Sequence, residues 1–289
     1  MYDHILFPTD GSETAESVLD YVFDVAAAHD ATLSVLNVAD TNRDSVTDVR
    51  GEIVDALEQA GERIVADAVE RAREAGIDAH GEVVQGDPAA TIVDHADRYD
   101  ADLVVMPTHG RSGIERVLLG SVTEGVVNTA PVPVLVVNPD GDRSYRYPAA
   151  DVLVPTDGSA GANRALAEAT DLASSTDATL HVLHVVETGT LGPDARSVIK
   201  ESELDAHAQA ILDEAVATAE GTLDDVVGSL RYGHPHREIQ RYVEDNDVDL
   251  LALGTQGQTN FSWYALGGVT SKLVRSSPVP VLTTRTPEE

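Results

Sequence analysis

The residues best suited to chemistry lie in a glycine-bearing segment between Met106 and Glu124. Gly110 and the pair Gly120-Ser121 in this segment precede a predicted helix. Such a loop presents backbone N–H groups and the positive end of the helix dipole, which both favour a phosphate. Glycine lets the backbone approach the anion without a Cβ in the way. The patterns G-x-x-x-x-G-K-[ST] and G-x-G-x-x-G are absent, so we predict neither a Walker A loop nor a dinucleotide fingerprint.

Asp10 is a second candidate, because an apolar run ends there in the sequence Pro-Thr-Asp-Gly-Ser. Both candidates have a purely structural alternative. The pattern D-x-x-E that begins at Asp10 and the pattern S-x-x-E that begins at Ser121 fit a capping box, in which the first side chain satisfies backbone N–H groups of a helix. The residue types alone therefore leave ligand binding and helix capping open.

The chain contains an internal duplication. The sequence Pro-Thr-Asp-Gly-Ser at 8–12 recurs at 155–159, an offset of 147 residues (157 minus 10). A constant offset indicates one domain copied, so we expect domains at 1–140 and 150–289 and a linker at 141–149. Neither capping box survives in the second copy although its aspartate does, which favours a role for the aspartate beyond capping. The same offset relates Gly86 to Gly233, Gly110 to Gly257, Gly120 to Gly267, and the Pro-Val-Pro-Val at 131–134 to that at 278–281.

Each copy alternates short apolar runs with amphipathic segments. Near-continuous apolar strands separated by helices indicate a parallel sheet covered on both faces. We therefore expect an α/β chain of two tandem, doubly wound, Rossmann-like domains with five parallel strands each. Ligands of such sheets bind beyond the carboxyl ends of the strands, where both candidate loops lie. The predicted strands are 5–9, 32–38, 79–84, 103–107 and 132–137, then 152–156, 179–186, 225–232, 250–254 and 279–283; helices in the first copy are 13–28, 45–75, 88–99 and 121–129.

The charge balance narrows the class of partner. The 289 residues include 50 acidic and 19 basic side chains, a formal net charge of −31. A surface that binds nucleic acid needs Lys and Arg to displace counterions from phosphates, so we expect no nucleic acid partner. Such an acidic excess, with three Phe in the chain, is typical of a halophilic organism's cytoplasmic protein, because at molar salt the Debye length falls to about 3 Å. The recurring apolar strands argue against acidic disorder.

Composition also excludes several kinds of site. Cysteine is absent, which excludes disulfides, zinc–thiolate sites and iron–sulfur clusters. No apolar run approaches the roughly 20 residues that span a bilayer and no signal-peptide pattern opens the sequence, so we expect a cytoplasmic protein without membrane contact. His109 corresponds to Gln256 in the second copy, and His234 and His236 have no third ligand at a suitable spacing, so we predict no metal site.

Taken together, the loops resemble those of the universal stress protein family, and the resemblance covers nearly the whole chain, twice. The nucleotide-binding branch of that family carries G-x-x-G, nine residues and then G-[ST] after the fourth strand. In the first copy Gly110 and Gly120-Ser121 fit this pattern, with Pro107 in place of the first glycine. The second copy fits at Gly254, Gly257 and Gly267, with Gly268 in place of the Ser/Thr.

The resemblance implies ATP binding, with adenine and ribose near the ends of the first and second strands. It implies that Asp10 hydrogen-bonds a sugar or base group and that Val38 offers backbone groups to the adenine edge. Mg²⁺ would arrive on the phosphates, with Asp10 as the nearest carboxylate. The implied site residues are Pro8, Thr9, Asp10, Val38 and Met106 for the nucleoside and Gly110, Gly120, Ser121, Val122 and Thr123 for the phosphates, and in the second copy Pro155, Thr156, Asp157, Val185, Leu253, Gly254, Gly257, Gly267 and Gly268.

The first copy is predicted to be the better ATP site. Its loop carries two arginines, Arg111 and Arg116, whose charge is partly offset by Glu115. The corresponding residues 255–270 of the second copy include no charged side chain. The serine hydroxyl missing at Gly268 would otherwise make a hydrogen bond to a charged group, worth about 1.5–3 kcal/mol. We therefore expect the second site to be weakened or repurposed.

Three functions are consistent with these features. The first is an ATP-binding stress-response sensor or regulator with at most slow hydrolysis, because no base-plus-stabiliser set for fast chemistry is evident. The second is a nucleotide-independent interaction protein whose loops serve as caps and interfaces. The third, an enzyme of the adenine nucleotide α-hydrolase type, shares this architecture but favours Ser-Gly-Gly-x-[DS] where this chain has Thr-Asp-Gly-Ser.

The last strand of each copy is an apolar edge that follows Pro-Val-Pro. Members of the family commonly dimerise through that edge, and pairing removes the liability of unpaired strands. We therefore expect the two copies to pair as a pseudo-dimer within the chain, with further homo-oligomers left open.

Overall fold

The computed structural model describes residues 1–40, 50–109, 119–138, 145–187, 201–255 and 266–286. The chain divides into two compact units, Met1–Pro148 and Ala149–Glu289. All ten predicted strands occur, with ends shifted by up to two residues, and the expected α/β fold repeated in tandem is confirmed.

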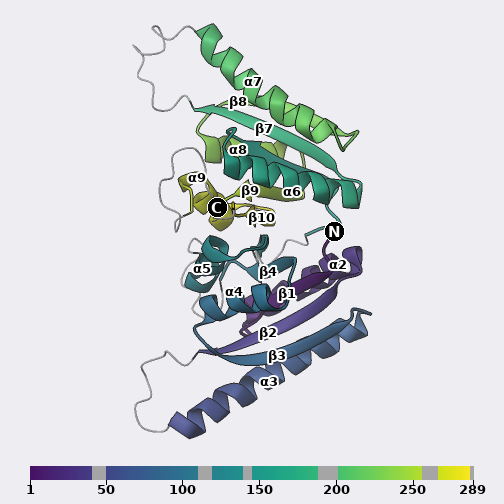
Figure 1. Ribbon diagram of the computed structural model, residues 1–289, viewed down its shortest axis with the longest axis vertical. Helices are drawn as coiled ribbons and strands as arrows, with labels where there is room; N and C mark the ends of the chain where they lie inside the picture. The colour runs from purple at the N-terminus through teal and green to yellow at the C-terminus, as the bar shows by residue number, and fades with distance from the viewer. Residues whose placement is uncertain (41–49, 110–118, 139–144, 188–200, 256–265, 287–289) are drawn as a thin grey trace. The chain divides into compact units, whose positions relative to one another are not determined.

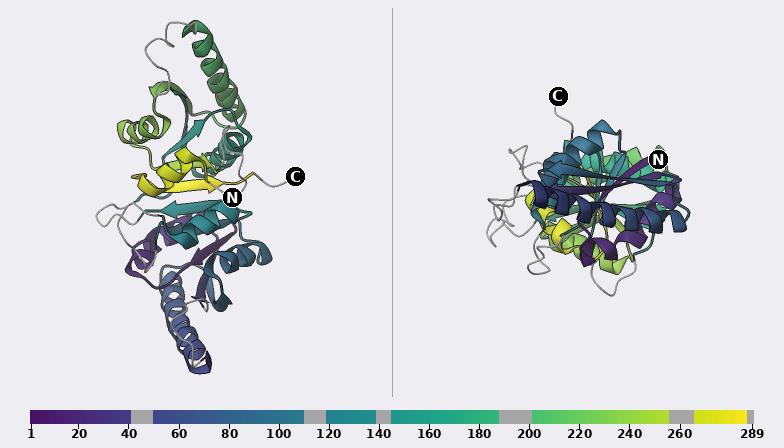
Figure 2. Two further views of the ribbon diagram at one scale, coloured as in Figure 1. Left: turned by 90° about the vertical axis from the view of Figure 1, so that its left-hand side faces the viewer. Right: turned by 90° about the horizontal axis from the view of Figure 1, so that it is seen from below.

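In the first unit the strands form a parallel sheet in the order β3-β2-β1-β4-β5. Helices lie on both sides of these strands (Figures 1 and 2). The winding reverses between β1 and β4, so the crevice beyond their carboxyl ends is the expected ligand position. The elements are β1 His4–Pro8, α1 Glu13–Ser17, α2 Leu19–His29, β2 Thr32–Asp40, α3 Arg50–Glu74, β3 Ala79–Gly86, α4 Pro88–Arg98, β4 Leu103–Pro107, α5 Ser121–Thr129 and β5 Val134–Val137.

The second unit repeats this topology, with a parallel order of β10-β9-β6-β7-β8. Its winding reverses between β6 and β9, the counterparts of β1 and β4. The elements are β6 Asp151–Thr156, α6 Ala160–Thr176, β7 Thr179–Glu187, α7 Glu201–Glu220, β8 Val226–Gly233, α8 Pro235–Asp245, β9 Leu250–Gly254, α9 Gly268–Ser276 and β10 Val281–Thr284.

The central strands form the core of each unit. Leu6 and Val104 in the first unit, and Leu153 and Ala252 in the second, have 0% of their surface exposed. Burial of consecutive residues on both faces explains why these strands are continuous apolar runs and do not alternate with polar residues.

The duplication extends to residues in the left-handed region of backbone conformation. Asp30 and Asp177, which end α2 and α6, have φ of 51° and 56°, and Asp100 and Asp247 both have φ of 49°. Aspartate tolerates this conformation better than most residues. Each pair is separated by 147 residues (177 minus 30, 247 minus 100), so the turns follow the same register as the motifs.

The two units differ in the helix that follows their first strand, which is broken in the first unit and continuous in the second. The single helix predicted at 13–28 is wrong, because α1 ends at Ser17 and α2 begins at Leu19, whereas α6 is continuous. In the second unit a Cβ on Gly254 would lie 2.4 Å from the carbonyl oxygen of Gly161 in α6. Gly254 therefore allows α6 to touch the end of β9, and the first unit has Pro107 at this position.

The predicted linker at 141–149 is not a plain spacer. Of its described residues, 145–148 belong to the first unit and Ala149 to the second, and the Tyr147 hydroxyl lies 2.6 Å from Nε2 of His29 in α2. The Tyr21 ring makes edge contacts with the rings of Tyr145 and Tyr147. Burial and, secondly, the N-terminal charge lower the pKa of His29 from 6.5 to about 4, so its imidazole is neutral at pH 7.

Gly254→Ala tests the close approach of α6 to β9. The added methyl would overlap backbone atoms, so we expect the free energy of unfolding of the second unit to fall by about 1–3 kcal/mol, the usual range for overpacking. Urea unfolding followed by far-ultraviolet circular dichroism measures this. Gly268→Ala is the matched control, because its Cβ would meet nothing within 4 Å. Equal stability of the two variants would contradict the packing argument.

His29 predicts a pH dependence of stability. Its pKa is lower in the folded protein, so the unfolded chain binds the proton first as the pH falls. The stabilisation from His29 is therefore complete above pH 6.5 and is lost as the pH falls from 6.5 to about 4. We expect wild type to lose more stability than His29→Gln across this window, measured by urea unfolding at several pH values. His207→Gln, at an exposed position in α7, should follow wild type.

Candidate functional site at the carboxyl ends of the strands

The first unit's candidate residues gather at the carboxyl edge around β1, β2 and β4. The pairing of β1 with β2 ends at Pro8 and Leu36, with one further bond from Thr9 N to Leu36 O of 2.8 Å. Leu36 therefore points its backbone groups toward β1, and so does Val38, two residues further along the strand. Because β1 has ended there, Val38 directs its N–H and C=O into the crevice. In the second unit the corresponding pairing runs one position further, to Thr156 and His184, and ends before Val185.

The loop after β1 is held by its own short side chains. Thr9 Oγ1 accepts a hydrogen bond from Gly11 N at 3.2 Å, and Asp10 Oδ1 accepts one from Ser12 N at 3.0 Å. Gly11 has φ of 66°, a conformation that favours glycine. The second unit repeats the arrangement, with Thr156 accepting from Gly158 at 3.2 Å and Asp157 from Ser159 at 3.0 Å.

The capping alternative for Asp10 is wrong. Ser12 is the N-cap of α1, and its Oγ accepts from Ala15 N at 3.2 Å. Ser159 caps α6 in the same way through Ala162 N, also at 3.2 Å. The aspartates at 10 and 157 instead form the turn that leads into the cap, and each of their carboxylates is oriented by a backbone N–H.

The capping-box alternative for Ser121 is also wrong. Gly120 is the N-cap of α5 and no side chain bonds to this cap, while Ser121 is the exposed first residue of the helix. The N–H groups of the first helical residues have no partner within a helix, by its geometry. The start of α5 therefore presents the Ser121 hydroxyl and backbone N–H groups, including that of Val122, at the end of β4.

Glycine at 120 permits a close approach to the end of β4. Gly120 N donates to Thr108 O at 2.8 Å, and a Cβ at this residue would lie 3.3 Å from that oxygen and from His109 Cα. In the second unit Gly267 N donates to Thr255 O at 2.9 Å. Both helices thus begin against the strand that precedes them.

The structure places some predicted residues differently. Thr123 is 3% exposed and its hydroxyl donates to Pro107 O at 2.9 Å, so this hydroxyl joins α5 to β4 and does not point outward as a phosphate donor. Met106 and Leu253 are each 4% exposed, at the base of the crevice. The predicted Gly110 and Gly257, and the arginines at 111 and 116, lie outside the described residues.

Two buried polar residues of the site were not predicted from the sequence. Asn37 Nδ2 donates to Thr9 O at 2.8 Å, and His184 Nδ1 donates to Thr156 O at 2.7 Å. A carbonyl oxygen only accepts, so His184 carries its proton on Nδ1. Asn37 and His184 are 7% and 9% exposed and are related by the 147-residue offset (184 minus 37). A polar residue at the same position of two apolar runs was the signal.

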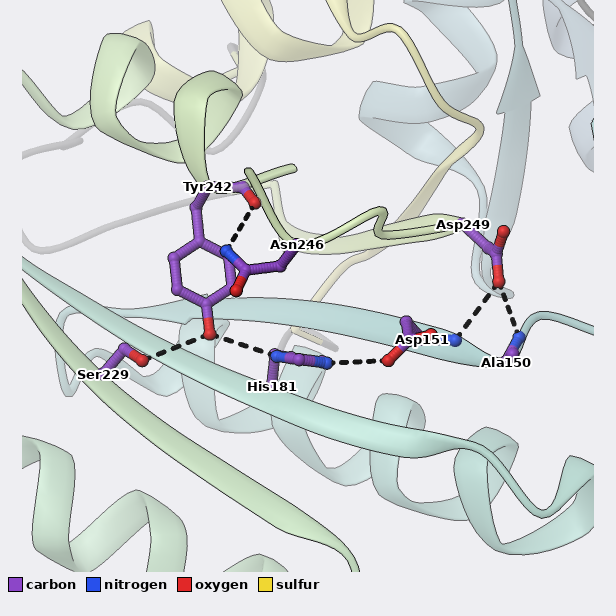
Figure 3. A network of polar contacts seen from close by, with 7 residues as sticks. All are labelled: Ala150, Asp151, His181, Ser229, Tyr242, Asn246 and Asp249. Carbon is purple, nitrogen blue, oxygen red and sulfur yellow. Dashed lines mark hydrogen bonds and ion pairs between the residues drawn. The ribbon is translucent and has the colours of Figure 1, made fainter. Parts of the chain in front are cut away.

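A separate polar network lies near the other end of the second unit's strands (Figure 3). His181 is 2.9 Å from Asp151 Oδ1 and 3.1 Å from the Tyr242 hydroxyl, which is 3.1 Å from Ser229 Oγ. Asp249 Oδ2 accepts from the backbone N–H of Ala150 at 2.8 Å and of Asp151 at 3.3 Å. This network joins the start of β6 to neighbouring strands and α8, on the edge opposite the candidate site.

No group of three or more His, Asp or Glu side chains is arranged to hold a metal ion in the described part of the chain. Among the helices described, none is long and apolar enough to cross a membrane.

Comparison with known proteins gives a consistent result. The universal stress protein family matches residues 1–138 and 150–285. The crystal structure of a universal stress protein from Archaeoglobus fulgidus is similar with a TM-score of 0.75 and 27% identity, and the match covers 98% of each chain. A universal stress protein of Methanocaldococcus jannaschii is 36% identical over 140 residues, 47% of this chain and 82% of the relative. One of Mycolicibacterium smegmatis is 27% identical over 292 residues, 97% of this chain and 96% of the relative.

Asn37→Val tests how the site loop is supported. The substitution leaves the Thr9 carbonyl without its side-chain donor, and an unsatisfied buried polar group costs about 1–3 kcal/mol. We expect the free energy of unfolding of the first unit to fall by that amount in chemical denaturation. Ser34→Val on the same strand removes only an exposed hydrogen bond to His80 and serves as the control. If both variants had the same free energy of unfolding, the hydrogen bond from Asn37 to Thr9 O would not contribute to stability.

Proposed function

The chain belongs to the universal stress protein family, and we propose that it binds ATP at the carboxyl ends of its strands, mainly in the first domain, as a sensor or regulator in the stress response. The observation that carries the proposal is the start of α5. Ser121 is exposed there and caps nothing, and the glycine before it brings the helix against β4. Helix N-termini of this kind are favourable positions for phosphate.

The loop after β1 supports binding of the nucleoside part. Asp10 is oriented by the N–H of Ser12, so its carboxylate is a positioned acceptor for a ribose hydroxyl. Val38 directs backbone donor and acceptor groups into the crevice beyond β1, where an adenine edge would pair with them. Asn37 fixes the Thr9 carbonyl between these two contacts.

The preference for the first domain follows from one hydroxyl. Ser121 corresponds to Gly268, which has no side chain to offer, and a hydrogen bond to a charged group is worth about 1.5–3 kcal/mol. If Mg²⁺ accompanies ATP, the phosphates would supply most of its ligands and Asp10 is the nearest candidate carboxylate. Hydrolysis, if any, would be slow, because the described residues beside the phosphate position do not form a set of base and stabiliser for fast chemistry.

The charge balance supports two further parts of the proposal. A formal charge of −31, from 50 acidic and 19 basic residues, fits a cytoplasmic protein of a high-salt organism. The same charge disfavours nucleic acid as a partner. Pairing of the two domains through their last strands and assembly into homo-oligomers remain predictions.

A second candidate function has one specific observation in its favour. The hydrogen bonds from Gly11 to Thr9 and from Ser12 to Asp10 form without any ligand, so the conformation of the loop needs none. This is what an interaction protein that does not bind nucleotide would show. It leaves the exposed serine at the start of α5 without a role, and we therefore rank it second.

Isothermal titration of ATP, ADP and AMP with Mg²⁺, at several KCl concentrations, tests the proposal. We expect Ser121→Ala to weaken ATP binding by about tenfold or more, the equivalent of at least one hydrogen bond to a charged group. Asp157→Ala should have a smaller effect. Ser17→Ala, whose exposed hydroxyl bonds only to Thr14 O among the contacts described, is the matched control.

Three results would change this conclusion. Absence of binding heat for all three nucleotides at every salt concentration would leave the nucleotide-independent interaction protein. Loss of ATP binding in Asp157→Ala alone would move the main site to the second domain. Equal affinity of Ser121→Ala and wild type would remove the serine from the site.

A further inference from the structure

The two domains differ at two positions on one face of equivalent helices. Ser121 and Gly125 of α5 correspond to Gly268 and Lys272 of α9, so the second domain loses a hydroxyl and gains an ammonium four residues later. Residues four apart lie on the same helix face, and long side chains lean toward the N-terminus. Lys272 therefore leans over the turn that contains Gly268. Among the described residues, a Cβ on Gly268 would have no neighbour within 4 Å.

Helix α8 adds further groups beside this lysine. Gln240 Nε2 donates to Ser276 Oγ at 2.8 Å and to Ser276 O at 3.1 Å, which fixes how α8 lies against α9. Both helices run away from the carboxyl edge of the sheet. One turn back toward that edge, His236 on α8 and Lys272 on α9 therefore lie next to each other.

The first domain confirms that these two positions are neighbours. The residues that correspond to His236 and Lys272 are Ala89 and Gly125, and a Cβ on Gly125 would lie 2.8 Å from the Ala89 Cβ. The first domain thus closes this space by packing two small residues together. The second domain has an imidazole and an ammonium in the same place.

Two neighbouring differences between the domains also make this part of the second domain more positively charged. His234 and Arg237 replace Asp87 and Ala90, and Asp87 in the first domain accepts from Ala90 N at 3.1 Å as a helix cap. We call His234, His236, Arg237 and Lys272 the cationic cluster. It carries two full positive charges where the first domain has one negative charge.

The nearest carboxylate on α8 does not cancel this charge. Glu238 Oε1 lies 2.9 Å from Arg241 Nη1, so the pair is neutral as a whole. Partial burial and then Lys272, Arg237 and His234 lower the pKa of His236, which agrees with these groups lying close to its imidazole. The chain has 50 acidic residues and two lysines, so a cationic cluster departs from its average composition. This cluster lies beside α9, the helix that begins at the candidate site.

We infer that the cationic cluster binds the phosphate tail of a nucleoside di- or triphosphate in the second crevice, with the Lys272 ammonium in place of the serine hydroxyl used by the first domain. This inference rests on the proposed function, because it assumes that the nucleoside lies in the crevice. Recognition in the second domain is then by charge. Its affinity rises with the number of phosphates and falls with salt, because exposed charges are screened.

The test uses the full chain with Asp10→Ala, which removes the first crevice from the measurement. ATP and AMP are titrated calorimetrically at low and molar KCl, with and without Lys272→Met. We expect Lys272→Met to weaken ATP binding by about tenfold, the usual effect of one charge-assisted contact, and AMP binding much less. Lys272→Arg should retain the affinity for ATP. Arg98→Met, which removes one exposed positive charge at the end of α4, should change neither nucleotide.

The outcomes separate this inference from the proposed function. If wild type binds ATP but the Asp10→Ala protein binds none, or binds it equally well after Lys272→Met, the cluster has no role and the first-domain site stands. Equal losses for ATP and AMP would also overturn the inference, because the cluster would not be reading the phosphate tail. If wild type binds no nucleotide, the proposed function itself fails.

Discussion

The backbone hydrogen bond between the start of α5 and the end of β4 is the interaction on which the candidate site depends. Gly120 N donates to Thr108 O at 2.8 Å, and the second domain repeats the bond from Gly267 N to Thr255 O at 2.9 Å. A side chain at residue 120 would crowd that oxygen, so glycine permits the helix to start there. The bond holds the first turn of the helix at the edge where parallel sheets bind ligands.

The two domains keep this backbone frame and exchange the polar groups that line it. Asn37 and His184 support equivalent carbonyls with an amide and an imidazole. At the helix start, a serine hydroxyl in one domain is matched by a glycine with a lysine four residues later in the other. A duplicated site in which the frame is fixed by main-chain bonds can change its ligand-facing chemistry without disturbing the fold.

The acidic excess of the chain is partly structural. Asp102 Oδ2 accepts from the backbone N–H groups of Asp3 and His4 at 2.8 and 2.9 Å, and Asp249 makes the equivalent contacts in the second domain. Other aspartates end helices in the left-handed conformation. The remaining negative charge disfavours binding of an anion unless hydrogen-bond donors or cations lie at the site itself. The hydroxyl, N–H and ammonium groups at the helix starts are therefore the groups that could bind a phosphate.

The sequence by itself determined the α/β class, the tandem duplication and the loops that form the crevice, because apolar periodicity and a constant offset are local and repeated signals. It did not determine which residues cap the helices, where the Thr123 hydroxyl points, or that Asn37 supports Thr9. Only the tertiary structure decided the last two, since Thr123 and Asn37 bond to Pro107 and Thr9, which other elements bring close. The caps are local contacts, but the sequence offers both an aspartate and a serine at the start of α1. Ser121 shows the difference: its residue type fits a cap, but Gly120, which is bonded to Thr108 O, is the N-cap and leaves Ser121 as the exposed first residue of α5.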